Sequence, residues 1–146
     1  MSAADVGVAC PLFVVKDVPT TLAFYRDRLG FEITFQGPEP QDIFFGMVGR
    51  GLAMFMFKSI GVEPVPNHTR DIKQGIAPWD AYVHTPDPDA LHAELQARNV
   101  QFFKPLMNNQ DGLRGFEVQD PNGYVLYFGT PHESARREFG LTDKTA

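Results

Sequence analysis

Asp80 is the residue of this chain whose surroundings point most directly to chemistry. It stands between Trp79 and Ala81 in an alternating segment, residues 78–85, that predicts a β-strand. A carboxylate with such apolar neighbours is costly to bury unless it is paired or partly hydrated. We therefore consider three roles for Asp80: a general base, the receptor of a cationic ligand group, or a rim residue paired with an arginine.

Cys10 and the four histidines are weaker candidates for a catalytic or metal-binding site. Cys10 has no adjacent His or Lys that would lower its pKa, so we interpret it as a small buried residue of a central strand rather than a nucleophile. His84 shares the expected strand face of Asp80 but lies at its far end. The other histidines are scattered, and no pair has the spacing of a metal site; they are His68, His92 and His132.

The elements that must position these residues follow one pattern that occurs twice, about seventy residues apart. Residues 8–57 and 80–128 each read as a strand, a helix and three further strands. Each half ends in an apolar strand that a glycine opens, Gly51 in the first and Gly123 in the second. The repeat predicts one domain built from two similar modules, with any site between them.

In the first module, the continuous apolar run 7–15 predicts a strand buried on both faces, at the centre of a sheet. A helix is expected from Asp17 or Val18, with Pro19 in its first turn, to Gly30. We expect the loop of this module at residues 37–40, and strands at 31–36, 42–48 and 52–58.

In the second module, the strand 78–85 is followed by a helix that starts at residues 86–88. Further strands are expected at 101–104, 113–119 and 124–128. The whole chain, 1–146, is read as a single domain with module one at about 7–58, a linker at 59–77, module two at about 78–129 and a tail at 130–146. A linker of this length is either mobile or part of a binding site, and the sequence leaves both open.

Composition and charge limit the partners. The chain has 146 residues with 43% hydrophobic and 12% aromatic residues, which is enough for a real core, and its formal net charge is −5. No basic cluster exists, so we expect neither a nucleic-acid nor a membrane partner, and a neutral or cationic ligand is easier to accommodate. The single Cys10, a start without a basic leader region and the absence of an apolar run of about 20 residues predict a cytoplasmic protein.

Several local motifs carry a family resemblance. Asp17-Val18, Phe24-Tyr25-Arg26-Asp27, Leu29-Gly30-Phe31, Gly115-Phe116-Glu117-Val118 and Asp120-Pro121-Asn122-Gly123-Tyr124 together resemble the vicinal oxygen chelate superfamily over residues 7–129. That superfamily includes glyoxalase I, fosfomycin-resistance enzymes, extradiol dioxygenases and bleomycin-resistance proteins. The resemblance implies an α+β fold in which two βαβββ modules form a curled mixed sheet around a cavity, with the helices outside and commonly two subunits, so we expect a homodimer.

The resemblance also implies where a metal would bind. Metal-dependent members carry His or Glu on the first and last strand of each module, and the motifs align these positions with Cys10, Phe55 (within one residue), Asp80 and Tyr127. A catalytic divalent ion needs about three N, O or S ligands. Only Asp80, and less well Cys10, offers one, because the phenol of Tyr127 ionises near pH ~10 when unperturbed. We therefore expect no metal and no cofactor.

Five apolar and aromatic residues remain open to two interpretations. They either fill an ordinary core or line the family's cavity as a pocket for a flat or bulky ligand, with methionines adapting in shape and phenols supplying hydrogen bonds. The tyrosines favour a pocket, because buried hydroxyl groups need partners. With Asp80 they form the expected ligand-binding set: Phe55, Tyr82, Tyr127, Met54 and Met56.

The sequence thus supports a leading hypothesis and an alternative. The first is a metal-independent small-molecule binding protein, similar to the bleomycin-resistance type, that confers antibiotic resistance by sequestering its ligand. The expected ligand is a hydrophobic or aromatic compound, and compounds with a positive charge are included. The alternative is an enzyme, either a glyoxalase-like lyase or isomerase or a dioxygenase, with an atypical metal site made of Asp80, Tyr127 and Cys10, or a metal-free enzyme with Asp80 as its base. Whether any reaction is catalysed, and which ligand is bound, the residues leave open.

Overall fold

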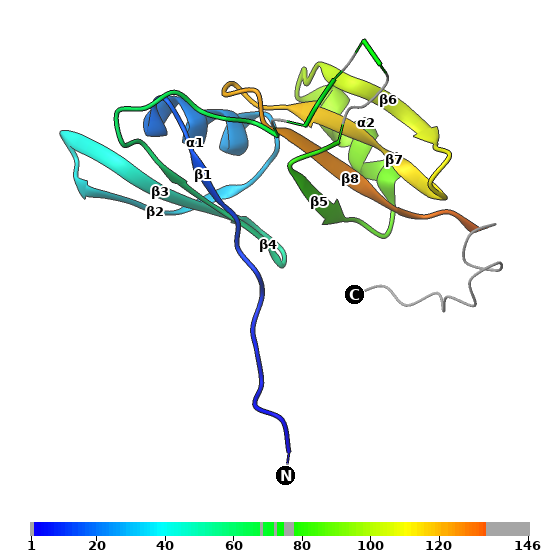
Figure 1. Cartoon of the computed structure of the whole chain (residues 1–146), viewed down its shortest axis with the longest axis horizontal. Helices are drawn as coiled ribbons and strands as arrows, with labels where there is room; N and C mark the ends of the chain where they lie inside the picture. Colours follow the sequence, from blue (N-terminus) through cyan, green and yellow to red (C-terminus); the bar gives the residue numbers. More distant parts are fainter. Residues whose placement is uncertain (1, 68, 72, 75–77, 134–146) are drawn as a thin grey trace. The chain divides into compact units, whose positions relative to one another are not determined.

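A computed structural model describes residues 2–67, 69–71, 73–74 and 78–133 of the chain. The chain divides into two compact units, residues 1–64 and 65–146 (Figure 1). Each unit contains one four-stranded sheet and one α-helix among its described residues.

The first unit is a βαβββ module. Asp17 caps its helix by accepting a hydrogen bond from the Thr20 N–H at 2.9 Å. In the sheet, whose strand order is β1-β4-β3-β2, β1 and β4 are parallel and the other pairs are antiparallel. The elements are β1 (Leu12–Val14), α1 (Val18–Asp27), β2 (Glu32–Glu39), β3 (Asp42–Arg50) and β4 (Ala53–Lys58).

Aromatic rings fill the core between α1 and this sheet. Tyr25 of α1 is fully buried, and its ring centroid lies 4.7 Å from that of Phe57 and 5.7 Å from that of Phe55. Phe31 lies 6.0 Å from Tyr25 in an edge-on arrangement. Ring pairs at such distances add to the stabilisation that apolar burial gives. Phe55 and Phe57 therefore point to the helix side of the sheet.

The second unit repeats the same topology. Its strand order is β5-β8-β7-β6, again with one parallel pair, β5 and β8, beside two antiparallel pairs. The elements are β5 (Ala81–His84), α2 (Pro88–Ala97), β6 (Phe102–Asn108), β7 (Leu113–Gln119) and β8 (Val125–Pro131). The predicted α+β class and the two βαβββ modules are confirmed. Curling of the sheets around a shared cavity stays a prediction.

Helix α2 covers one face of the second sheet (Figure 1). His92 of α2 lies against Phe102 and Phe116, and Phe116 stacks on Phe128 with 5.5 Å between the ring centroids. Successive side chains of a strand point to opposite faces. The neighbours Glu117 and Tyr127 therefore point away from α2.

Most strands differ from their predicted bounds by at least one residue, and the differences at β1, β2 and β6 have a clear physical reason. The first strand was expected to begin at Gly7, but β1 begins at Leu12 and residues 2–9 are exposed and extended (Figure 1). An apolar run forms a strand only where a partner is available, and β1 pairs with just three residues of β4. β2 and β6 extend beyond their expected ends, through Pro38 and Pro105, because both are edge strands, where a residue without an N–H is tolerated.

Most of the expected linker, residues 59–77, lies among the described residues. Its part from Val65 onward belongs to the second unit, while residues 68, 72 and 75–77 lie outside the described part of the chain, as does most of the expected tail, residues 134–146. A search of the described residues for membrane-spanning helices finds none with the necessary length and apolar character.

Candidate ligand-binding site

Four side chains of the second unit form a row across all four strands. Tyr82 of β5 pairs with Tyr127 of β8, Tyr127 pairs with Glu117 of β7, and Glu117 pairs with Lys104 of β6. Residues directly opposite one another in a sheet share a face. The row therefore lies on the face that α2 leaves uncovered.

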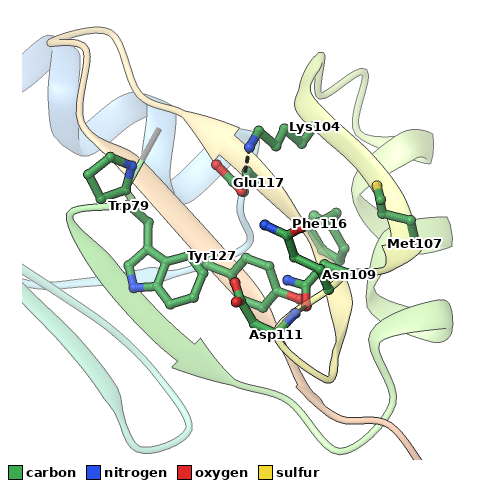
Figure 2. A pocket seen from close by; sticks show the side chains of 10 residues that line it. Trp79, Lys104, Met107, Asn109, Asp111, Phe116, Glu117 and Tyr127 are labelled. Carbon is green, nitrogen blue, oxygen red and sulfur yellow. Dashed lines mark hydrogen bonds and ion pairs between the residues drawn. The ribbon is translucent and has the colours of Figure 1, made fainter. Parts of the chain in front are cut away.

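Three side chains of this row, Lys104, Glu117 and Tyr127, line a pocket of about 870 Å³ (Figure 2). A volume of this size falls in the range of sites that hold drug-sized ligands. One part of its lining comes from the strands β6, β7 and β8, with Lys104, Glu117 and Tyr127, and from Trp79, which precedes β5. Another part comes from residues 109–111, between β6 and β7. All of the lining residues belong to the second unit.

Aromatic rings form one wall of the pocket. The Trp79 and Tyr127 ring centroids are 4.6 Å apart, and Figure 2 shows the two rings next to each other. Tyr82 stacks on Tyr127 with 5.7 Å between the centroids and 10° between the ring planes. The Tyr82 hydroxyl donates a hydrogen bond to the Gly129 carbonyl at 3.1 Å. Such a wall suits a flat, apolar ligand.

Two glycines let the Tyr127 ring lie close to the sheet. A Cβ atom at Gly129 would come within 2.5 Å of Tyr127 Cε1, and a Cβ atom at Gly115 within 2.7 Å of the Tyr127 hydroxyl. The Gly115 Cβ would also collide with the carbonyl oxygen of Phe128. Because real Cβ atoms do not approach so closely, these two positions require glycine. The glycine pair thus determines where the phenol lies.

Glu117 is the acid of the pocket. Its side chain is 7% exposed and forms a 3.8 Å ion pair between Oε2 and Nζ of Lys104, drawn as a dashed line in Figure 2. The other oxygen, Oε1, is buried and has no hydrogen-bond partner among the described residues. Burial raises the pKa of Glu117, and the positive charges of Lys104 and Arg70 only partly oppose this rise.

Tyr127 brings the second unsatisfied oxygen. The residue is 3% exposed, and within the described part of the chain its hydroxyl has no hydrogen-bond partner. Desolvation by burial, followed by the influence of Tyr82, Glu117 and Asp111, raises the pKa of Tyr127 to about 12. The phenol is therefore neutral at physiological pH. Buried polar groups in proteins are nearly always hydrogen-bonded, so this hydroxyl is an exception among the described residues.

Asp80, the acid that the sequence singled out, has its oxygens engaged elsewhere. Oδ2 accepts hydrogen bonds from Arg70 Nη2 at 2.7 Å and from the Val125 N–H at 2.8 Å, and Oδ1 accepts one from the Asn67 N–H at 2.6 Å. The ion-paired side chains are 9% and 11% exposed. Of the three roles considered, the structure supports the pairing with an arginine. This largely buried pair ties Asn67 and Arg70 to the start of β8.

The alternation predicted for the strand at residues 78–85 places Trp79 and Tyr82 on opposite faces, and this prediction is wrong. The Trp79 ring lies 6.0 Å from that of Tyr82 and close to Tyr127. The reason is that β5 begins only at Ala81, so the alternation of a strand does not govern residue 79. The pocket thereby gains an indole that the sequence pattern assigned to the other face.

The candidates of the first unit lie on both sides of β4. Phe55 is 2% exposed and packs in the aromatic core beside α1, so it is not a pocket residue of this unit. Met54 and Met56 are half-buried on the opposite face. Met56 pairs with Leu12 of β1 as Tyr127 pairs with Tyr82 of β5, so Met56 rather than Phe55 is the counterpart of Tyr127.

The divalent metal that the family resemblance implies does not fit the four expected positions. Phe55 has no ligating atom, and Asp80 already binds Arg70 and two backbone N–H groups. Burial raises the thiol pKa of Cys10, and the phenol of Tyr127 has a pKa of about 12. Across residues 2–67, 69–71, 73–74 and 78–133, no three His, Cys, Asp or Glu side chains gather where they would hold a metal ion.

Sequence reasoning missed Glu117 and the two glycines. Glu117 lies between Phe116 and Val118, and this apolar flanking is the same signal that drew attention to Asp80. Gly115 and Gly129 carry a weaker signal, a glycine inside a strand, which often marks a close approach of other atoms.

Comparisons with known proteins agree with this architecture. The family profile described as Glyoxalase/Bleomycin resistance protein/Dioxygenase superfamily matches residues 7–128. No curated protein gives a significant match. A bleomycin-binding protein from bleomycin-producing Streptomyces verticillus, solved with copper(II)-bleomycin, is 28% identical, with 90% of this chain and 100% of that chain covered and a TM-score of 0.63.

Two further solved structures share the fold at lower identity. TioX from Micromonospora sp. ML1 is 19% identical, with 84% of this chain and 97% of that chain covered and a TM-score of 0.65. A bleomycin-binding protein complexed with bleomycin is 20% identical, with 85% and 98% covered and a TM-score of 0.63. From the family match and the two βαβββ modules, it follows that this chain belongs to the glyoxalase/bleomycin resistance protein/dioxygenase superfamily.

Proposed function

We propose that this chain is a metal-independent small-molecule binding protein that sequesters a hydrophobic or aromatic compound, including compounds with a positive charge, in the pocket of its second unit. The observation that carries the proposal is the pocket itself. It combines a wall of Trp79 and Tyr127 with two buried oxygens, on Glu117 and Tyr127, that have no hydrogen-bond partner in the described residues. Apolar burial supplies affinity, and the two oxygens supply orientation.

The compounds to try first are antibiotics with aromatic and cationic groups. The solved relative with 28% identity is a bleomycin-binding protein, which supports sequestration of an antibiotic as the biological role. Protection by binding requires no chemical step, and it suits a chain in which Cys10, Phe55, Asp80 and Tyr127 are poor metal ligands. We also propose that the protein is a homodimer that works in the cytoplasm. The first point is checked by light scattering after size-exclusion chromatography.

The test is a ligand screen by thermal shift, followed by calorimetry on each hit. Bleomycin, with and without copper(II), and a panel of cationic aromatic antibiotics are the probes. We expect at least one to raise the unfolding temperature of the native protein, and we expect the shift to disappear in Tyr127→Ala. Phe102→Leu is the matched control, because Phe102 stacks on His92 on the α2 side of the same sheet. A panel without any shift, or a shift that survives Tyr127→Ala, would contradict the proposal.

The enzymatic alternative has no specific observation in its favour. Its metal-free version requires Asp80 as a base, and the Asp80 oxygens accept hydrogen bonds from Arg70, Asn67 and Val125. Its metal-dependent version requires a stoichiometric ion, so elemental analysis of protein purified without a chelator distinguishes it directly. One zinc, nickel, manganese or iron ion per chain would reverse the ranking.

A further inference from the structure

We propose that Glu117 is the specificity-determining residue of this pocket and that its carboxylate binds a protonated nitrogen of an aromatic ligand, whose ring lies against Trp79 and Tyr127. The ligand class is thus an aromatic ammonium, amidinium or guanidinium compound. This inference rests on the proposed function and assigns the cation receptor to Glu117, because Asp80 is bound to Arg70.

The first argument is the unsatisfied acceptor. Glu117 Oε1 is buried in a residue that is 5% exposed, and the described residues provide no donor for it. A carboxylate oxygen accepts hydrogen bonds only, so its missing partner must be a donor. Glu117 is one of the residues that line the pocket. A ligand N–H is therefore the group that completes the site.

The second argument is charge. Three of the lining residues carry a formal charge. Lys104 is positive, whereas Asp111 and Glu117 are negative, so the pocket lining has a formal net charge of −1. Lys104 compensates Glu117 incompletely, because its Nζ is 3.8 Å away and its side chain is 46% exposed. Arg70 is the next cation, but it is already bound to Asp80 and to the Pro78 carbonyl. A buried carboxylate with so little compensation favours a cation over a neutral donor.

The third argument is the geometry of the row. Tyr127 is the direct cross-strand partner of Glu117, so an aromatic ring against Tyr127 brings its substituent next to the carboxylate. The Tyr127 hydroxyl, neutral because the pKa of the phenol is about 12, accepts a second N–H of the same group. Gly115 and Gly129 hold the ring in this position. Tyr127 thereby contacts the aromatic part of the ligand, and its neighbour Glu117 binds the cationic part.

A consequence is that acid should weaken binding. Burial raises the pKa of Glu117, so protonation removes the acceptor charge at a higher pH than for an exposed glutamate. The charged or titratable groups that face Glu117 are Lys104 from β6, Arg70 from the segment before β5, and Tyr127 from β8, with Asp111 further along the lining. The pH dependence of binding is assigned to Glu117 only if it is lost in a Glu117 variant.

The experiment compares two probes of nearly equal shape, 2-naphthylmethylamine and 2-naphthylmethanol, by calorimetry from pH 5 to pH 8. In the native protein at pH 8 we expect the amine to bind about tenfold more tightly than the alcohol, as a charge-assisted hydrogen bond predicts. The preference should shrink as the pH falls. In Glu117→Gln it should disappear and be independent of pH, while the alcohol still binds. Asp89→Asn removes an exposed acid instead and should leave the preference unchanged.

Lys104→Gln provides a second, independent test on an exposed side chain. Removing the competing positive charge should increase the affinity for the amine about threefold or more and leave that for the alcohol unchanged. A preference that survives in Glu117→Gln, equal binding of both probes, or an unchanged amine affinity in Lys104→Gln overturns the inference but leaves the proposed function intact. If neither probe binds at millimolar concentration, both the inference and the aromatic pocket are wrong.

Discussion

Glu117 and Tyr127 are direct partners across β7 and β8, and each keeps one buried oxygen without a hydrogen bond to the described residues. An unsatisfied buried group costs about 1–3 kcal/mol, so a pair of them side by side is a local loss of stability. Proteins tolerate such losses most readily where a bound ligand supplies the missing hydrogen bonds. This pairing leads to the first two predictions.

Tyr127→Phe should protect the protein against alkaline unfolding. The folded-state pKa of Tyr127, about 12, lies above the ordinary tyrosine value of 10.0. The stability contributed by the neutral phenol is therefore fully present below pH 10 and is lost as the pH rises through about 12. The full loss amounts to about 2–3 kcal/mol. Urea unfolding of both proteins at pH 8 and pH 11 measures the difference. Equal alkaline losses would contradict the assignment.

Glu117→Gln should be at least as stable as the native protein at pH 7. The raised folded-state pKa means that Glu117 contributes stability below its unfolded pKa, which is lost as the pH rises through the folded-state value. At pH 7 the native protein therefore carries a buried charge that the amide avoids. The urea midpoints should differ at pH 7 and converge near pH 4. A variant that is markedly less stable at pH 7 would show that the Lys104 pair outweighs desolvation.

Asp80→Asn should destabilise the second unit strongly. The change leaves Arg70 buried without its partner, and breaking a buried ion pair in this way costs about 3–5 kcal/mol. The matched control is Asp89→Asn, which breaks the more exposed pair with Arg114 and should cost less than about 1 kcal/mol. Guanidinium unfolding of the two variants gives the comparison. Similar losses in both would mean that the Asp80 pair has no structural importance.

Gly115→Ala should cost about 1–3 kcal/mol or more, because the new methyl group meets the backbone carbonyl of Phe128, which cannot move without disturbing β8. It should also displace the Tyr127 hydroxyl and weaken binding of any ligand found in the screen. Gly7→Ala is the control, since nothing lies within 4 Å of its Cβ position. Thermal unfolding measures both variants, and a neutral Gly115→Ala would refute the close approach.

Much of the fold was readable from local patterns. The two strand-helix-strand-strand-strand series were predicted, as were a helix start at Asp17 or Val18 and another at residues 86–88, because caps and prolines act within a few residues of the chain. The motifs of both modules predicted the family, and the family profile confirmed it.

The site was readable only in part. Tyr82 and Tyr127 were proposed as ligand-binding residues and line or adjoin the pocket, and Met54 and Met56 remain proposals for the first unit. Phe55 went to the core because a shift of one residue in a strand exchanges its two faces, and sequence spacing fixed the register only to within one residue.

The sequence by itself determined the two-module architecture and the presence of two acids with apolar neighbours, Asp80 and Glu117. Only the tertiary structure decided which acid is paired with an arginine and which keeps a buried oxygen without a donor among the described residues. Arg70, from a segment without any periodicity, neutralises Asp80, whereas Glu117 receives only a distant lysine from the neighbouring strand. The physical reason is that the state of a buried charge depends on the groups that surround it in space, and these come from parts of the chain that local sequence patterns do not connect.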